Sequence, residues 1–319
     1  MILTVTLNAA LDRTVAVPNF RLGRRHRAVE ERTVAGGKGV NVARALRRLG
    51  QPVIATGLAG GPTGDRIVEQ LTEEGVLNAF TRIGDNSRTN LAVIDPTSGE
   101  QTEINERGPS VSAEEADLFT EKLLYLAQGA DFCVMAGSVP PGLDAEVYAQ
   151  LIAELRRHEV PVLLDTDGEP MRAGLRAGPA VVAPNLAEAE EAVGHEFNEP
   201  EDLVLGLREL IEMGAGEAII TQAAGCVAIV GEPSGRTRYE VEIGALEPVA
   251  AVGSGDAFVA GYVAARWRGR SARECLAYGV ACGAESTQHF GAGVLDPREV
   301  DRMLPEVLVE PLEEPALRG

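Results

Sequence analysis

The hydrophobic pattern of the chain alternates between short apolar runs and longer stretches with apolar residues at helical spacing. The helical stretches carry acidic residues near their starts, as helix amino termini commonly do. Strands are predicted at residues 2–7, 53–57, 132–136, 160–165, 180–184, 218–221 and 227–230, and helices at residues 114–126, 145–157 and 203–213 among others. Because strands and helices alternate, the pattern predicts an α/β fold with a mostly parallel central sheet and helices on both faces.

Two segments, residues 12–35 and 86–107, lack helical periodicity. Residues 14–17 alternate in the first segment, and in the second a turn signal at residues 95–99 separates two apolar stretches, which is typical of a hairpin. We expect the two segments to form a small β-sheet lid that projects from the α/β body, covers the active site and supplies a subunit contact. The length allows either one large α/β domain or two smaller units. We find no internal repeat and no low-complexity linker, and we treat residues 1–319 as a single domain.

Composition is that of a globular protein, with 45% hydrophobic and 24% charged residues among 319. The apolar stretch at residues 1–7 lacks a basic region and is too short for a signal peptide, and no apolar run reaches the roughly 18 residues that span a bilayer. The four cysteines show no CxxC spacing and no metal-ligand rhythm with the histidines, which favours reduced thiols. We expect a cytoplasmic protein without a membrane partner.

The charge of the chain is unevenly distributed. A net charge of −19 argues against nucleic acid as a partner, because phosphate backbones would be repelled. Residues 1–50, however, hold ten Arg or Lys against three acidic residues, a net of +7. This asymmetry favours a small anionic ligand. We interpret Arg44, Arg47 and Arg48 as solvated positions of a helix face.

Three common glycine motifs are absent. A P-loop would need glycine at Arg32 and Ser or Thr at Gly39, after Lys38. A nucleophile elbow around Ser254 would need glycine at Val252. No GxGxxG follows the first predicted strand, which argues against a dinucleotide site of the Rossmann type.

Two other glycine-rich stretches lead into predicted helices. In the first, residues 253–261, the N–H groups of Gly253, Ser254 and Gly255 are placed to bind negative charge on a transferring phosphoryl group. Asp256 follows in the first turn, where it either accepts the proton of an attacking hydroxyl or simply caps the helix. In the second, residues 35–43, Lys38 and Asn41 are available for hydroxyls and phosphate, although an ordinary strand-to-helix turn has the same pattern.

The chain resembles the PfkB (ribokinase-like) family of carbohydrate kinases over nearly its whole length. Ordered motifs carry the resemblance at residues 6–12, 36–43, 87–90, 102–106, 136–142, 164–169, 184–188 and 253–256. Within the family the chain is similar to the branch that holds 1-phosphofructokinase, tagatose-6-phosphate kinase and the minor 6-phosphofructokinase. The resemblance implies a ribokinase-like three-layer α/β/α sandwich with a small β-sheet lid.

The resemblance also implies roles for matching positions. It makes Asp256 the catalytic base and residues Gly253, Ser254 and Gly255 the anion hole. The implied substrate-binding residues are Asp12, Gly37, Lys38, Asn41, Arg88, Asn90, Ser138 and Arg27, with Arg88 and Arg27 on the existing phosphate and Arg27 reaching across a dimer. The implied nucleotide-binding residues are Asn185, Glu188, Thr221, Gly225 and Gly283, with Mg²⁺ held near Glu188 through water. Without the family, Glu188 would be an ordinary exposed helix residue.

The implied activity is the phosphorylation of a ketohexose phosphate by Mg-ATP. Residues 102–106 and the amino-terminal motif favour conversion of fructose 1-phosphate to fructose 1,6-bisphosphate. Tagatose 6-phosphate, fructose 6-phosphate and a non-catalytic sugar-phosphate-binding regulator remain alternatives. Two positions depart from the family: Ala183 replaces a lysine that commonly precedes Pro-Asn, and Ala223 places a methyl group in the ATP loop. The expected assembly is a homodimer through the lid.

Overall fold

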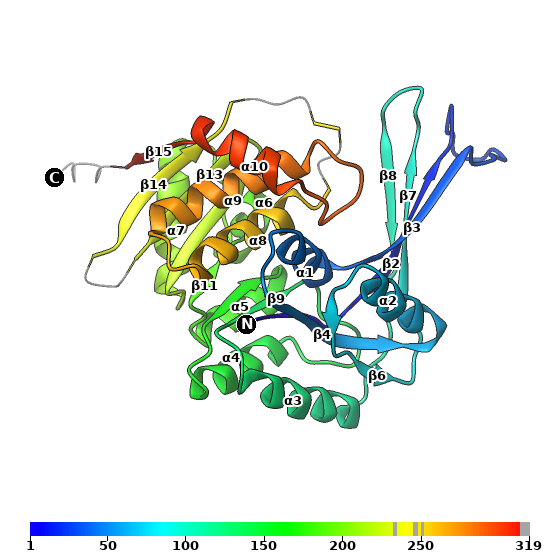
Figure 1. Ribbon diagram of the computed structural model, residues 1–319, viewed down its shortest axis with the longest axis horizontal. Helices are drawn as coiled ribbons and strands as arrows, with labels where there is room; N and C mark the ends of the chain where they lie inside the picture. The colour runs from blue at the N-terminus through cyan, green and yellow to red at the C-terminus, as the bar shows by residue number, and fades with distance from the viewer. Residues whose placement is uncertain (232–234, 245–247, 250–251, 313–319) are drawn as a thin grey trace.

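A large twisted sheet forms the middle layer of the protein (Figure 1). The computed structural model describes residues 1–231, 235–244, 248–249 and 252–312. Along the sheet the strands follow the order β15 (Leu308–Pro311), β14 (Thr237–Glu242), β13 (Gly225–Val230), β12 (Glu217–Gln222), β11 (Val181–Val182), β10 (Val162–Asp165), β9 (Phe132–Ala136), β1 (Ile2–Thr6), β4 (Val53–Gly60) and β5 (Leu77–Asn78), with β6 (Thr81–Ile83) also on β4. From β12 to β5 all pairings are parallel, which confirms the predicted mostly parallel sheet.

Helices cover both faces of the sheet. The bounds of those beside the first core are α1 (Lys38–Arg48), α2 (Gly61–Glu73), α8 (Ser254–Trp267), α9 (Ala272–Ser286) and α10 (Pro297–Met303). The bounds of those beside the second core are α3 (Ala113–Ala127), α4 (Val147–Arg157), α5 (Gly168–Arg176), α6 (Leu186–Val193) and α7 (Pro200–Glu212). Successive strand residues alternate between the two cores, as with Phe132 and Cys133 on β9. The result is a three-layer α/β/α sandwich, as expected.

The predicted lid is a separate sheet with the order β3 (Glu30–Gly36), β2 (Ala10–Ala16), β7 (Arg88–Ile94) and β8 (Gln101–Asn105). It projects from the body on the right of Figure 1. The parallel pairing of β2 with β7 joins the two segments that lacked helical periodicity. The prediction of a small separate sheet is therefore confirmed, whereas its roles as a cover of the active site and as a subunit contact stay predictions.

One connection differs from the predicted alternation of strands and helices. β12 and β13 form an antiparallel hairpin, and β14 and β15 extend the sheet in the antiparallel direction. The β12–β13 turn contains Ala223 and Ala224, which are not typical turn residues. The hydrophobic pattern therefore predicts the two strands without showing that they are joined directly.

All four cysteines lie in the interior. Cys133, Cys226, Cys275 and Cys282 are free and buried, and burial raises the pKa of each thiol, to about 11 for Cys275. In the described part of the chain, no helix has the length and apolar character needed to cross a membrane.

Candidate functional site

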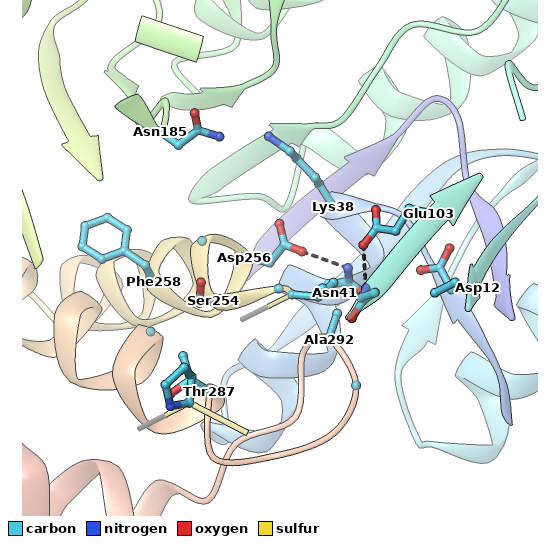
Figure 2. Close-up of a pocket in the computed structure, with 18 of the residues that line it drawn as sticks. Asp12, Lys38, Asn41, Glu103, Asn185, Ser254, Asp256, Phe258, Thr287 and Ala292 are labelled. Atoms are coloured by element: carbon cyan, nitrogen blue, oxygen red, sulfur yellow. Dashed lines mark hydrogen bonds between the residues drawn. The ribbon is translucent and has the colours of Figure 1, made fainter. Parts of the chain in front are cut away.

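A cleft of about 1500 Å³ opens between the lid and the carboxyl ends of the parallel strands. Ligands in open α/β sheets bind at this edge, at the point where the strand order reverses. That point is β1, because the chain proceeds from β1 to β4 on one side and returns to β9 on the other. Figure 2 shows side chains from the lid, α1 and α8 converging there.

Asp256 lies in the first turn of α8 and faces Asn41 of α1 (Figure 2). The residue is 7% exposed, and its Oδ2 accepts a hydrogen bond of 2.8 Å from Nδ2 of Asn41. Burial, together with the negative charge of Asp165, raises the pKa of Asp256 to about 7. A carboxylate with that pKa is suited to accept a proton near neutral pH. No side-chain cap is formed at this helix start, so the capping interpretation of Asp256 is not supported.

Glycine is favoured at positions 253 and 255, before Asp256, for different structural reasons. Gly253 has φ of 84°, and a Cβ there would lie 2.5 Å from Cβ of Ala292. A Cβ at Gly255 would meet no atom within 4 Å, although Gly255 lines the cleft. The first turn of α8 is thus open to a ligand, and its N–H groups lack acceptors within the helix. Gly253, Ser254 and Gly255 all line the cleft with Asp256, as the anion-hole prediction requires.

Asp12 and the turn before α1 border the cleft on the lid side. Oδ1 of Asp12 accepts a hydrogen bond of 2.8 Å from Nδ2 of Asn90, and burial raises the pKa of the Asp12 carboxyl. A Cβ at Gly36 would lie 1.8 Å from Oδ2 of Asp12, so glycine at that position leaves room for the carboxylate. Gly37 precedes α1 with φ of 107°, a conformation that favours glycine. The predicted residues Asp12, Gly37, Asn41 and Asn90 are brought together.

Lys38 is placed differently from the sequence expectation. Its Nζ donates hydrogen bonds of 2.8 Å to Asp165 at the end of β10 and to Glu188 on α6. Although burial opposes its charge, these two carboxylates hold the pKa of Lys38 above its ordinary value. The ammonium therefore points to the carboxylates rather than to the sugar-binding turn. Asp165 was missed as a site residue, although an acid at the carboxyl end of a predicted parallel strand was a usable signal.

Glu188 and Asn185 form a capping box at the start of α6. Oδ1 of Asn185 accepts from the N–H of Glu188 at 3.0 Å, and Oε2 of Glu188 accepts from the N–H of Asn185 at 3.0 Å. The side chain of Glu188 is only 15% exposed, which an ordinary exposed helix residue would not be. The same carboxylate caps the helix with one oxygen and binds Lys38 with the other.

The remaining predicted nucleotide-binding residues line the same cleft. Thr221, near the end of β12, forms an isolated parallel β-bridge with Asn185, which follows β11. Gly283 packs against α8. A Cβ at Gly225 would lie 1.8 Å from the carbonyl oxygen of Val241, so strand pairing requires glycine there. Of the two positions that depart from the family, Ala183 is buried and Ala223 is exposed, and both line the cleft.

Arg88 lies where the main cleft meets a second hollow. Its Nε donates to the carbonyl of Asn8 and its Nη1 to the carbonyl of Glu106, both at 3.1 Å. The second hollow contains Ser138, whose Oγ accepts a hydrogen bond from Asn8. Arg88 and Ser138 are therefore close to each other. Arg27 is exposed in the loop between β2 and β3 and lines neither hollow in the single chain.

Arg44 was wrongly interpreted as a solvated residue. Its side chain is 7% exposed, and its guanidinium contacts Asn41 of the site. The sequence signal was weak: Arg44 stands one helical turn after Asn41, where it lies on the same face of α1.

The donors near Glu188 fit a hard divalent cation. Asp165 and Glu188 converge from β10 and α6 and line the cleft with carboxylate oxygens. Among the described residues no cluster of three or more His, Cys, Asp or Glu is arranged to hold a metal by itself. Mg²⁺ commonly takes one or two carboxylates and completes its shell with water and substrate phosphates, so the residues present are compatible with it.

Comparisons with known proteins agree with this geometry. The model of the pfkB family carbohydrate kinases matches residues 5–298. A curated 1-phosphofructokinase from Borreliella burgdorferi is 32% identical over 310 residues, which cover 97% of this chain and 98% of that protein.

Two solved structures of phosphofructokinase-2 from Escherichia coli have the same fold, each with a TM-score of 0.87 over 95% of this chain and 98% of that one. One shows the tetrameric inhibited form and is 28% identical. The other is a complex with fructose-6-phosphate and is 27% identical.

Proposed function

Because the chain belongs to the pfkB family of carbohydrate kinases, we propose that it transfers the terminal phosphoryl group of ATP to a hydroxyl of a fructose phosphate. The preferred acceptor in this proposal is fructose 1-phosphate, and the product is fructose 1,6-bisphosphate. The observation that carries the proposal is Asp256: a buried carboxylate with a pKa of about 7, at the amino end of a helix in the main cleft.

Asp256 acts in this proposal as the general base. Its Oδ2 is oriented by Asn41, and the carboxylate takes the proton of the attacking hydroxyl as the oxygen–phosphorus bond forms. Asp12 and Asn90 are hydrogen-bonded to each other on the lid side, where their polar atoms are suited to orient the sugar hydroxyls. Holding the hydroxyl beside the base supplies the proximity that such a reaction needs.

The first turn of α8 stabilises the negative charge on the phosphoryl group. Its unpaired N–H groups and the positive end of the helix dipole face a space that Gly255 leaves open. Asn185, Thr221, Gly225 and Gly283 line the part of the cleft in which we place the nucleotide.

We place Mg²⁺ beside Asp165 and Glu188, where it would neutralise charge on the ATP phosphates. Lys38 supplies a positive charge to the same two carboxylates, and this contact fixes their position. The ammonium of Lys38 therefore lies on the side of the cleft in which we place the nucleotide.

Arg88 is our candidate for the phosphate already on the substrate. Its Nε and Nη1 are fixed by two carbonyl oxygens, and it lines both hollows. A planar guanidinium fork is well matched to phosphate. Ser138 lines the second hollow and adds a hydroxyl group.

The choice of fructose 1-phosphate follows the curated relative, which carries that activity in its name. Fructose 6-phosphate is the second candidate, because it is bound in the phosphofructokinase-2 complex. A furanose with a CH2O group at each end presents similar shapes in either orientation.

Parallel kinetics with fructose 1-phosphate, fructose 6-phosphate and tagatose 6-phosphate test the proposal. With Mg-ATP as donor, we expect kcat/KM to be at least about tenfold higher for fructose 1-phosphate, a difference of about 1.4 kcal/mol in transition-state binding. A higher value for another sugar phosphate would replace the substrate assignment. Binding of all three without turnover would favour the regulator instead.

We further propose that the protein is a cytoplasmic homodimer formed through the lid. The lid exposes apolar side chains that a partner would cover, with Leu22 90%, Val29 69% and Ile104 59% exposed. Arg27 lies in the same loop as Leu22, so a partner seated on the lid would bring it near the other chain. Buried free thiols and the use of ATP support the cytoplasm as the compartment.

A further inference from the structure

Arg44 is the most extensively bonded buried cation next to the site and has no assigned role. It lies on α1, and its side chain is 7% exposed. Nε and Nη2 of its guanidinium bind the two carboxylate oxygens of Glu74 at 2.5 and 3.1 Å. Because Glu74 compensates the charge, the other donor positions of Arg44 are available for groups of the site.

Those remaining donors meet three different parts of the site. Nη1 donates to Oδ1 of Asn41 at 3.3 Å and to the carbonyl of Ala292 at 3.2 Å. Nη2 donates to the carbonyl of Ala35 at 2.9 Å, directly before the turn that leads into α1. Ala292 in turn packs against Gly253, the residue that precedes α8. One guanidinium therefore links the turn before α1, the amide of Asn41 and the loop against the first turn of α8.

The contact with Asn41 decides which end of the amide faces Asp256. The two ends of an amide have nearly the same shape, and only hydrogen bonding distinguishes them. A guanidinium only donates, so it holds Oδ1 of Asn41 toward itself. The Nδ2 group then points to the carboxylate of Asp256, to which it donates at 2.8 Å. Without Arg44, the amide would lose one of the two partners that fix this orientation, and only the carboxylate of Asp256 itself would hold it.

We propose that Arg44 is a positioning residue that holds the amide of Asn41 in the one orientation that donates to Asp256. It touches neither the proposed sugar nor the nucleotide, and it acts on the reaction through Asn41 and the loop at Ala292. The inference rests on the proposed function for its kinetic consequence, but the fixed amide is a property of the free protein and is measured separately.

The kinetic test is a double-mutant cycle with Arg44→Lys, Asn41→Ala and the double variant. Lysine keeps the charge for Glu74, but a single ammonium cannot make the five contacts of the guanidinium. We expect Arg44→Lys to lower kcat roughly 10- to 100-fold, as small displacements of catalytic groups do, while the KM for ATP changes less than about threefold.

If Arg44 acts through Asn41, the double variant loses no more activity than Asn41→Ala alone. Arg47→Lys is the matched control: Arg47 is on the same helix, is exposed, and donates to the carbonyl of Gly75. It should keep wild-type kinetics. The proposal would be overturned if the losses of the two single variants multiply in the double variant. It would also be overturned if Arg44→Lys lowers kcat no more than Arg47→Lys does.

A second measurement does not depend on turnover. The side-chain amide of Asn41 gives a pair of nuclear magnetic resonance signals, identified by their loss in Asn41→Ala. We expect this pair to be slowly exchanging with solvent in the wild type and in Arg47→Lys, and to exchange faster and shift in Arg44→Lys, whose melting temperature is recorded in parallel.

Unchanged Asn41 signals in a folded Arg44→Lys protein would refute the positioning role. Wild-type protein without activity toward any of the three sugar phosphates would contradict the proposed function instead and leave the signal test intact.

Discussion

At the scale of single residues, Asp256 makes the sharpest prediction. Asp256→Asn keeps the shape of the side chain and an oxygen that accepts from Asn41, but it cannot take a proton. We expect kcat to fall about 10²- to 10⁴-fold, the usual contribution of a positioned base. ATP binding, measured by calorimetry, should change little. If the variant keeps half of the wild-type kcat, Asp256 is not the base.

The pH dependence of the wild type follows from the same residue. The base must be deprotonated, and the pKa of Asp256 is raised to about 7 by burial and by the charge of Asp165. We therefore expect kcat to decrease below about pH 7, measured at saturating substrates. A profile that stays flat down to pH 5 would show that another group accepts the proton.

Stability should depend on pH through this carboxyl as well. Its folded pKa lies above the value of about 3.9 for the unfolded chain, so its stabilising contribution is complete below that value and is lost as pH rises through about 7. Asp256→Asn lacks this dependence. We expect its melting temperature, relative to that of the wild type, to be higher at pH 8.5 than at pH 5.5, by the equivalent of a few kcal/mol at most. A pH-independent difference would contradict the raised pKa.

Variants of Arg88 test recognition of the substrate's phosphate separately from catalysis. If it binds the substrate's phosphate, Arg88→Ala should raise the KM for the sugar phosphate and lower kcat/KM about 10- to 150-fold, while the KM for ATP hardly moves. Arg88→Lys should recover only part of the loss, because a point charge does not reproduce the fork. Arg82→Ala is the control, since Arg82 is exposed and pairs with Asp65. Equal weakening of both substrates would assign the phosphate to other residues.

Residue identities were predictable where a local motif carries the chemistry, as with Asp256 after its glycines and Asn41 after Lys38. Partners were not predictable. Lys38 and Glu188 are 150 positions apart. No local pattern indicates that the ammonium of Lys38 binds two carboxylates that are distant in the sequence. The burial of Arg44 depends on the same kind of distant contact, with Glu74 and Ala292.

At the scale of elements, the first turn of α8 depends on two glycines for different reasons. Gly253→Ala would force a methyl group against Ala292 and strain a residue with φ of 84°, so we expect a loss of about 1–3 kcal/mol of stability. Gly255→Ala meets no neighbour and should fold as well as the wild type, but its methyl group enters the space we assign to the phosphoryl group and should lower kcat. Unfolding and kinetics of both variants are measured together. Full activity in Gly255→Ala would place the phosphoryl group elsewhere.

Regular elements followed from the sequence because their patterns are local. The periodicities of strand and helix depend on neighbours two to four residues away, and seven strands of the large sheet matched predicted runs: β1, β4, β9, β10, β11, β12 and β13. The short strands β5 and β6 were not predicted. The hairpin between β12 and β13 was not foreseen, because Ala223 and Ala224 carry no turn signal. The strand β14 was also missed, although polar residues alternate with Tyr239 and Val241 along Thr237–Glu242.

At the scale of the whole molecule, the lid dimer predicts that two inactive proteins complement each other. If Arg27 of one subunit serves the cleft of the other, a mixture of Arg27→Ala and Asp256→Asn contains heterodimers with one intact site. After unfolding and refolding equal amounts together, we expect about a quarter of wild-type activity, because half of the dimers are mixed and each has one working site of two.

Each variant refolded alone should stay near its own low activity. Light scattering at micromolar concentration shows the assembly directly. A fully active monomer of 33.7 kDa, or a mixture no more active than the sum of its parts, would refute the shared site.

Because all four cysteines are buried, a cysteine introduced in the lid can be labelled selectively. A maleimide reacts with exposed thiolates, and the native thiols are buried with pKa values above the ordinary range. Ser98 is exposed in the turn between β7 and β8, at the far end of the lid. A fluorophore on Ser98→Cys would therefore label that one position without removal of any native cysteine. Its emission would follow the lid as sugar phosphate is added.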